Sequence, residues 1–198
     1  MPSPEDVRAA LTDKLEKCSR EGIGIDSITF SGNGEPTLNP AFADIIDIVL
    51  ELRDRYYPKA KVSVLSNATM VGKKDIFNAL RKVDNPILKI DASSTEGVML
   101  INRPAGHYDL LETVENLKRF EGDFILQTMF LKSPEFDSAE KANLAAWMEL
   151  VKELRPREIM VYTLDRETPE KDLTKYSVDE MTKMVRPLID AGFPIQIR

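Results

Sequence analysis

A carboxylate bracketed by glycine and proline follows the first apolar run of the chain, in the segment Ser31–Leu38 (SGNGEPTL). The two glycines let the backbone turn tightly and approach a ligand, and their N–H groups could receive an anionic or carbonyl group. Glu35 stands between Gly34 and Pro36, so its carboxylate has a restricted direction and suits a ligand ammonium. A plain strand-to-helix turn with a solvated Glu35 explains the same residues, because a lone glycine-rich turn is a weak signal.

Two further pairs of polar residues end or follow the next two apolar runs. Ser66 and Asn67 offer hydroxyl and amide groups to a ligand, although such residues also terminate strands by bonding nearby backbone. Lys89 and Asp91 are two residues apart, so in a strand both side chains project to the same face. Opposite charges inside a sheet are costly unless they are paired or used. Lys89 and Asp91 are therefore either a structural ion pair or functional groups.

The later apolar runs add an amide and a second charged pair. Gln127 shares a strand face with Met129, and a polar amide in an apolar strand needs a partner, whereas Met129 is interpreted as a gap filler. The segment Tyr162–Arg166 (YTLDR) ends in Asp165 and Arg166, which could pair with each other or bind a polar ligand.

Buried strands must position these groups, and six short apolar runs predict them. The runs are dense in Val, Ile, Leu and Phe rather than strictly alternating, which is typical of parallel strands covered on both faces. They are Ile25–Phe30, Lys61–Ser66, Ile87–Asp91, Phe124–Phe130, Glu158–Thr163 and Ile195–Ile197. Helices are predicted around them at Pro4–Glu21, Pro40–Tyr57, Lys73–Val83, Tyr108–Phe120, Ser138–Leu154 and Ser177–Ala191.

This alternation predicts one α/β domain over residues 1–198. Parallel crossovers are almost always right-handed, and repeated βα units build either a barrel or a doubly wound sheet. Both architectures place ligands at the carboxyl ends of the strands. We therefore expect six parallel strands in sequential order, with one cleft lined by Glu35, Asn67, Asp91, Gln127 and Thr163.

The composition is that of a globular chain rather than a disordered or membrane protein. Of 198 residues, 42% are hydrophobic and 30% are charged, and no apolar run approaches the roughly 20 residues of a membrane span. The N-terminus lacks the basic and apolar regions of a signal peptide. The net charge of −6 argues mildly against a nucleic-acid surface. Because Cys18 is the single cysteine, no internal disulfide can form and a cytoplasmic location is expected.

The segment Ile28–Leu38, with its Gly-Glu-Pro-Thr core, resembles the strand-end motif of radical S-adenosylmethionine (SAM) enzymes. Other matching pieces fall at successive strand ends in the family's order, so that the resemblance covers Ser27–Arg166. The chain looks similar to a branch of iron–sulfur oxidoreductases. That branch includes the enzyme that rearranges a tRNA guanine towards wybutosine and, more broadly, pyruvate formate-lyase activating enzymes. The resemblance implies a partial (βα)6 TIM-like barrel that binds SAM.

The resemblance also implies roles for single residues. The loop that would contact the methionyl end of SAM contains Gly32, Asn33, Gly34, Glu35, Pro36 and Thr37. Ser66 and Asn67 would approach the ribose or the carboxylate, and the adenosine side would be lined by Gln127, Tyr162 and Thr163. The remaining candidate contacts to SAM or substrate are Lys89, Asp91, Asp165 and Arg166.

One departure from the family is large. The family holds a [4Fe–4S] cluster with a CxxxCxxC loop, and cluster iron needs thiolate ligands, but Cys18 is single and lies in a predicted helix. The expectation is a barrel whose first βα unit has been removed, by design, proteolysis or a truncated gene. No metal ligands are assigned, and the chain alone should be inactive in radical chemistry. The complete enzyme would reduce SAM to a 5′-deoxyadenosyl radical.

Several alternatives stay open. The substrate could be a protein that carries a glycyl radical, a tRNA or a small molecule, and no membrane partner is expected. A different βα-barrel enzyme of the lyase or isomerase type would use Lys89 as an amine nucleophile or base. A binding module without a cluster would use the same loops without catalysis.

Overall fold

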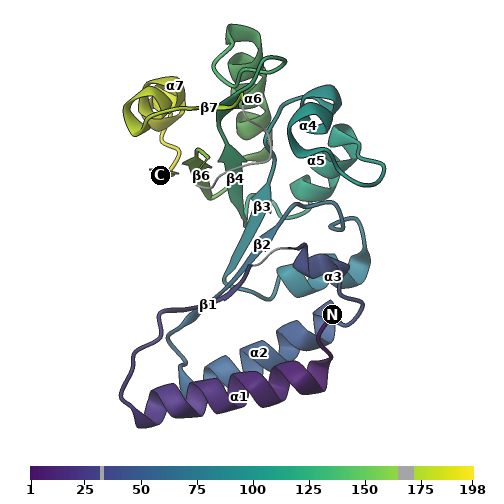
Figure 1. Cartoon of the computed structure of the whole chain (residues 1–198), viewed down its shortest axis with the longest axis vertical. Coiled ribbons are helices and arrows are strands. Elements are labelled where there is room, and N and C mark those ends of the chain that lie inside the picture. The colour runs from purple at the N-terminus through teal and green to yellow at the C-terminus, as the bar shows by residue number, and fades with distance from the viewer. Residues whose placement is uncertain (32–33, 165–171) are drawn as a thin grey trace. The chain divides into compact units, whose positions relative to one another are not determined.

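The computed structural model describes residues 1–31, 34–164 and 172–198. The chain forms two compact units, Met1–Ile87 and Leu88–Arg198. The boundary between them falls inside strand β3 (Asn85–Lys89), and Figure 1 shows the elements of each unit. The expectation of a single domain over the whole chain stays a prediction.

The first unit has two long helices on one side of its strands. Helix α1 (Pro4–Arg20) begins with a capping box, in which Ser3 and Asp6 each bond the other's backbone N–H. Helix α2 (Phe42–Tyr56) packs alongside α1 (Figure 1). Five of its apolar residues recur at helical spacing and form one buried stripe: Phe42, Ile45, Ile46, Val49 and Leu52.

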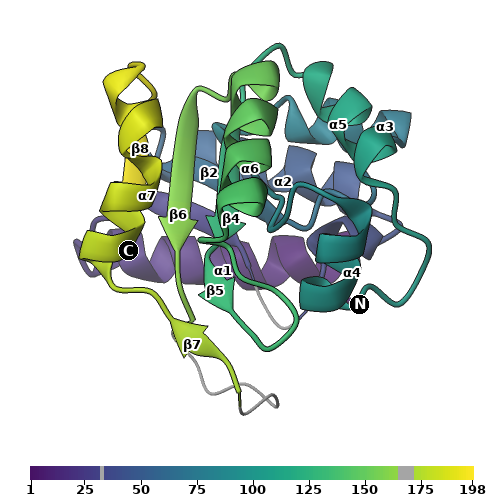
Figure 2. The same cartoon turned by 90° about the horizontal axis from the view of Figure 1, so that it is seen from above.

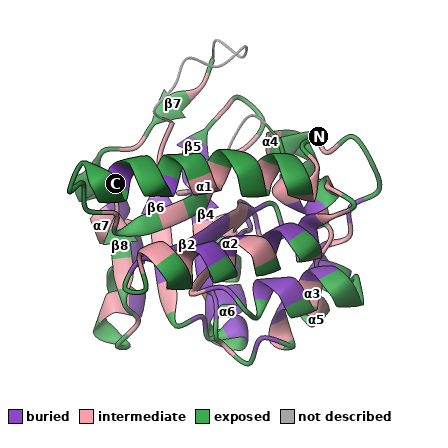
Figure 3. Cartoon of the chain, turned by 90° about the horizontal axis from the view of Figure 1, so that it is seen from below, coloured by how far each residue is buried: buried purple, intermediate pink, exposed green. Residues whose placement is uncertain are grey.

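The strands of the first unit run in the order β1–β2–β3. Strand β1 (Ser27–Phe30) pairs in parallel with β2 (Lys61–Ser66), from Ser27 opposite Lys61 to Phe30 opposite Val64. A short 3₁₀ turn η1 (Pro36–Leu38) follows β1, and helix α3 (Lys74–Leu80) follows β2. Figure 3 shows that α1 is exposed along most of its length, and only Leu15 and Cys18 of this helix are buried.

The second unit continues the strand order as β3–β4–β6–β8. Strands β4 (Ile125–Met129), β6 (Glu158–Tyr162) and β8 (Ile195–Ile197) pair in parallel. Helices α4 (Thr95–Asn102) and α5 (Leu110–Lys118) precede β4, α6 (Lys141–Leu154) precedes β6, and α7 (Val178–Asp190) precedes β8. Figure 2 shows α6 beside β4 and β6.

A buried polar contact fixes helix α6 on strand β4. The Trp147 Nε1–H donates to the Thr128 hydroxyl over 3.1 Å, and that hydroxyl donates to the Ile90 carbonyl over 2.7 Å. The Phe130 and Trp147 rings meet edge to face with centroids 5.0 Å apart. The Trp147 side chain is buried and belongs to the core.

The predicted α/β alternation and the sequential order of six strands are confirmed, with three differences. Strand β3 occupies Asn85–Lys89, so Asp91 lies beyond the strand that was predicted to contain it. At the start of this strand, the Asn85 amide Nδ2–H donates to the Ser63 hydroxyl over 3.1 Å. Helix α4 and a two-stranded antiparallel pair, β5 (Leu131–Lys132) with β7 (Thr174–Lys175), were not predicted.

Helix α4 escaped prediction because a glycine stands in its first turn. A Cβ on Gly97 would lie 2.8 Å from the Ala92 Cβ, so close packing rather than helix propensity selects glycine there. The Ser94 hydroxyl caps the helix by accepting from Gly97 N–H over 3.0 Å. Among the described residues, no helix is long and apolar enough to cross a membrane.

Candidate functional site

In the first unit, the Glu35 carboxylate joins the loops that follow β1 and β2. Its Oε1 atom accepts from the Thr37 N–H at 3.0 Å, from the Thr37 hydroxyl at 2.5 Å and from the Ser66 hydroxyl at 2.8 Å. Its Oε2 atom accepts from the Asn67 N–H at 2.7 Å. Glu35 is half-buried, so this carboxylate is held by the protein on one side and reachable on the other.

The loop after β2 has its own local bonds that hold this arrangement. The Ser66 hydroxyl accepts from the Ala68 N–H at 3.1 Å, and Ala68 adopts a left-handed backbone with φ of 63°. The side-chain oxygen of Asn67 accepts from both the backbone N–H and the hydroxyl of Thr69, at 3.1 and 2.7 Å. The structure therefore brings Glu35, Ser66 and Asn67 together, as the order of strand ends predicted within this unit.

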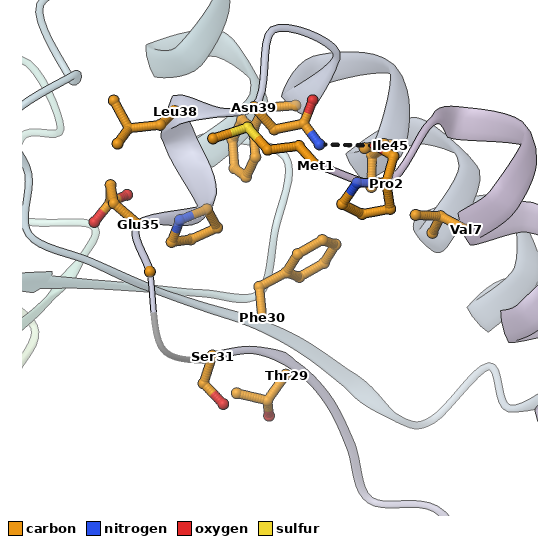
Figure 4. A pocket seen from close by; sticks show the side chains of 13 residues that line it. Met1, Pro2, Val7, Thr29, Phe30, Ser31, Glu35, Leu38, Asn39 and Ile45 are labelled. Carbon is orange, nitrogen blue, oxygen red and sulfur yellow. Dashed lines mark hydrogen bonds between the residues drawn. The ribbon is translucent and has the colours of Figure 1, made fainter.

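An apolar pocket of about 500 Å³ lies beside the same loop (Figure 4). The side chains of Phe30, Phe42 and Ile45 form much of its wall, and the Asn39 Nδ2–H donates to the Pro2 carbonyl over 3.0 Å at its rim. Figure 4 shows that the carboxylate of Glu35 points away from these apolar side chains. The pocket is therefore a mainly apolar neighbour of the carboxylate site.

In the second unit, Lys89 and Asp91 form an ion pair at the end of β3. The Lys89 Nζ lies 2.7 Å from the Asp91 Oδ2, and the Asp91 side chain is fully buried. The Asp91 Oδ1 accepts from the Met129 N–H at 2.8 Å. Oδ2 makes no contact with hydrogen-bond geometry, so the nearby ammonium balances its charge without a well-aligned hydrogen bond.

Two tyrosines, Tyr162 and Tyr108, interact electrostatically with this ion pair. Burial opposes the charge of Lys89, but the Asp91 carboxylate and Tyr162 outweigh that cost and raise the pKa of Lys89. Burial raises the pKa of Tyr162, Lys89 opposes the rise, and Asp91 adds to it. Burial and the nearby Asp91 carboxylate also raise the pKa of Tyr108, which no sequence pattern had singled out. Lys89 is thus an ammonium beside a carboxylate and a neutral phenol.

One face of the sheet in the second unit remains partly open. Gln127, Met129, Met160 and Tyr162 are half-buried, whereas the residues that alternate with them in β4 and β6 are buried. Met129 and Tyr162 are partners in the β4–β6 register. The open face therefore carries an amide, two thioethers and a phenol, which agrees with the predicted shared face of Gln127 and Met129.

Thr163 has a structural task at the end of β6. Its hydroxyl donates to the Phe130 carbonyl over 3.1 Å and accepts from the Tyr176 N–H over 3.2 Å. Tyr176 in turn bonds the Asp137 carboxylate, and burial together with this bond raises the pKa of Tyr176. The Thr163 hydroxyl is committed to backbone groups, so only its methyl group and backbone remain for a ligand.

A second pocket, of about 530 Å³, lies in the second unit near the ends of β4 and β6. The C-terminal end of α4 forms one wall, where Arg103 adopts a left-handed backbone with φ of 43°. Sequence reasoning missed the residues of this wall because helix α4 was not predicted. The pocket is lined by Leu100, Ile101, Asn102, Arg103, Met129, Leu131, Ser133, Pro134, Glu135, Leu164, Asp172 and Leu173.

Four candidate residues, Gly32, Asn33, Asp165 and Arg166, lie outside the described residues. Gly34 and Pro36 flank Glu35 beside the apolar pocket. Glu35 and Asn67 belong to the first unit, and Asp91, Gln127 and Thr163 belong to the second. The expectation that these five residues line one cleft stays a prediction.

Comparison with known families identifies the chain. The family model described as the Radical SAM superfamily matches residues 3–141. The chain belongs to the radical SAM superfamily. The matched segment contains the Glu35 loop, the Ser66–Asn67 turn and the Lys89–Asp91 pair. The resemblance inferred from the strand-end motifs is confirmed.

Curated relatives are longer than this radical SAM chain. A protein of Brachyspira hyodysenteriae named GTPase Obg is 27% identical over 188 residues, which are 93% of this chain and 26% of that protein. A UPF0026 protein of Synechocystis sp. is 28% identical over 155 residues, 76% of this chain and 54% of that protein. The chain thus spans between a quarter and about half of the length of these two relatives.

Solved structures of radical SAM proteins share the fold. A radical SAM methyltransferase from Sphaerobacter thermophilus aligns with a TM-score of 0.73 and 16% identity, covering 100% of this chain and 57% of its own. A domain of the pyruvate-formate lyase-activating enzyme from Bacteroides vulgatus gives a TM-score of 0.62 at 19% identity, covering 86% of this chain and 98% of its own. Streptococcus suis SuiB bound to S-adenosylmethionine aligns with a TM-score of 0.67 at 15% identity, covering 96% of this chain and 42% of its own. The partial TIM-like fold class is confirmed.

The family uses SAM and a [4Fe–4S] cluster, and the residues of this chain suit the two cofactors unequally. The Glu35 carboxylate, with Oε2 holding a single donor, has the chemistry that an ammonium group needs. For the cluster, Cys18 is the single cysteine of the sequence and is buried in α1. No group of three His, Cys, Asp or Glu side chains among the described residues could hold a metal ion. The residues present therefore suit SAM and do not suit the cluster.

Proposed function

We propose that this chain is the SAM-binding part of a radical SAM oxidoreductase, and that the cluster ligands belong to residues outside this sequence. The observation that carries the proposal is the Glu35 carboxylate, which lies in the loop after β1, within the matched segment, and is held in one orientation by four hydrogen bonds. In the complete enzyme, SAM supplies the 5′-deoxyadenosyl radical. The role of this chain in that enzyme is to bind and orient SAM and the substrate of the enzyme.

The methionyl end of SAM is assigned to the first unit. A SAM ammonium would sit against the Glu35 Oε2, and Asn67 stands beside it to approach the carboxylate or the ribose. The loop residues assigned to the same end are Gly32, Asn33, Gly34, Pro36 and Thr37. An ammonium–carboxylate contact is charge-assisted and therefore stronger than a neutral hydrogen bond.

Residues of the second unit remain proposed contacts, each by itself, for adenosine or for the substrate. The half-buried Gln127 and Tyr162, together with the backbone and methyl group of Thr163, offer a partly apolar face for adenosine. The Lys89 ammonium offers a cation to an anionic group, and Asp91 holds that cation in place. Asp165 and Arg166, outside the described residues, are proposed as substrate contacts.

The second pocket supports a small molecule or a single peptide side chain as the substrate. Its volume of about 530 Å³ falls within the range of roughly 300–1,000 Å³ that is typical of small-molecule sites. Its lining combines aliphatic side chains with Arg103, Glu135 and Asp172, which would orient a ligand that has polar ends. A cytoplasmic location is proposed on the same grounds as from the sequence, the single cysteine.

Titration calorimetry with SAM tests the proposal. The chain should bind SAM measurably, and Glu35→Ala should weaken binding roughly 10- to 100-fold, because a hydrogen bond to a charged group contributes about 1.5–3 kcal/mol. Glu21→Ala, which removes an exposed glutamate at the end of α1, is the matched control and should leave the affinity unchanged. Equal SAM affinity of the native chain and Glu35→Ala, or no binding by either, would refute the proposed function.

A further inference from the structure

The two oxygens of the Glu35 carboxylate are used unequally. Among the described residues, Oε1 accepts three hydrogen bonds, two from Thr37 and one from the Ser66 hydroxyl, whereas Oε2 accepts one, from the Asn67 N–H. An ionised carboxylate offers about four lone-pair positions over its two oxygens. Oε1 is therefore saturated, and Oε2 is the oxygen with room for another donor.

The two hydroxyl groups on Oε1 are shielded from solvent and have fixed directions. Thr37 is 2% exposed and Ser66 is 5% exposed. The Ser66 oxygen accepts from the Ala68 N–H at 3.1 Å, so its one proton is left for Glu35 at 2.8 Å. The Thr37 hydroxyl donates to the same oxygen, and the Thr37 N–H adds a third bond from within the loop. Neither hydroxyl is free for a ligand.

We infer that Ser66 and Thr37 are positioning residues, which hold the Glu35 Oε1 so that Oε2 faces the ammonium of the bound ligand. This inference rests on the proposed function. It gives Ser66 and Thr37 a different role there, because they act through Glu35 instead of contacting SAM. Holding the carboxylate in its binding orientation before the ligand arrives lowers the ordering cost of binding. The benefit should appear only for ligands that carry the ammonium.

The test compares two ligands on variants that lose one hydroxyl. SAM carries the amino-acid group, and 5′-methylthioadenosine has the adenosine and the sulfur without it. Ser66→Ala and Thr37→Val should each raise the Kd for SAM by roughly 5- to 20-fold, from the loss of one hydrogen bond to a charged group, while the Kd for methylthioadenosine should stay within about twofold. Thr37→Ser keeps the hydroxyl and should restore SAM binding.

The outcomes separate the inference from the proposed function. Unchanged SAM affinity in folded Ser66→Ala and Thr37→Val would overturn the positioning role and leave the proposed function standing. Equal losses for both ligands, or failure of Thr37→Ser to restore binding, would show a purely structural role and overturn it as well. A native chain that does not bind SAM would overturn both. Circular dichroism monitors folding, and if Ser66→Ala unfolds, Thr37→Val decides, because it leaves the Ser66 bond intact.

Discussion

The ammonium of Lys89 lies 2.7 Å from the Oδ2 atom of Asp91, whose side chain is fully buried, while that of Lys89 is 26% exposed. The pair links the end of β3 to the end of β4, because Oδ1 of the same carboxylate accepts from the Met129 N–H. The two partners are therefore unequal: water partly solvates the cation, but only the protein solvates the anion.

Removing the cation should cost more than neutralising the anion. Lys89→Met leaves a buried carboxylate unpaired and should destabilise the fold by about 3 kcal/mol, at the low end for broken buried ion pairs. Asp91→Asn keeps an acceptor for the Met129 N–H and should cost about 1–2 kcal/mol. Urea unfolding at pH 7 measures both. A larger loss for Asp91→Asn than for Lys89→Met would contradict this account of the pair.

Lys89 should not form a Schiff base. Its raised pKa keeps the amine protonated at neutral pH, and a protonated amine is not a nucleophile. Treatment with pyruvate and borohydride at pH 7, followed by peptide mass spectrometry, should label Lys89 no more than the exposed Lys175. Selective labelling of Lys89 would favour a lyase-type barrel instead.

Asp84 should make the free energy of unfolding of the first unit depend on pH in the acidic range. Burial alone would raise the pKa of Asp84, but bonds from Lys61, the Val62 N–H and Arg53 lower it to about 2. A lowered carboxyl pKa stabilises the fold above the unfolded value of about 3.9, and this stability is lost as the pH falls from about 4 to 2. The contribution at pH 7 is about 2 kcal/mol.

Unfolding of the native chain and of Asp84→Asn, measured in urea from pH 7 to pH 2, checks this dependence. The native chain should exceed the variant by about 2 kcal/mol at pH 7, and the two should converge near pH 2. A difference that stays constant over this range would show that the carboxylate charge has no part in it.

The Trp147–Thr128 hydrogen bond should be visible in fluorescence. Thr128→Val leaves the buried Trp147 Nε1–H without an acceptor and should cost about 1–3 kcal/mol, whereas Thr128→Ser keeps the hydroxyl and should cost less. Because Trp147 is the single tryptophan, its emission should shift in Thr128→Val and not in Thr128→Ser. Emission that is identical in all three proteins would argue against this hydrogen bond.

The chain should bind no stoichiometric [4Fe–4S] cluster by itself. Anaerobic reconstitution with iron and sulfide, followed by Mössbauer spectroscopy, should give no cluster signal, because one buried cysteine cannot replace a set of thiolate ligands. Cys18→Ser should behave like the native chain. A cluster that forms in the native chain and is lost in Cys18→Ser would refute the assignment of the ligands to residues outside this sequence.

The order of the main strands and the family were readable from the sequence, because both depend on local patterns. Apolar density marks buried parallel strands, and helical spacing marks α2, in which five apolar residues form a buried stripe. The Gly34–Thr37 motif by itself indicated the family, and the matched segment 3–141 agrees with it. Helix α4 was missed because the local pattern there is misleading. Gly97 disfavours a helix locally, and glycine is selected at this position by its close contact with Ala92.

The roles of single side chains were decided by tertiary structure, because they depend on which partners arrive from elsewhere in the chain. Ser66 and Thr37 are residue types that often contact ligands. Their hydroxyl groups donate to Glu35 instead, which is 31 residues from Ser66 and two residues from Thr37 in the sequence. Thr163 is likewise a residue type suited to contacting a ligand, but its hydroxyl donates to the carbonyl of Phe130, directly after β4. Residue type and spacing thus determined where polar groups gather at the strand ends. Only the fold determined which lone pairs and protons remain for a ligand, since long-range hydrogen bonds use the others first.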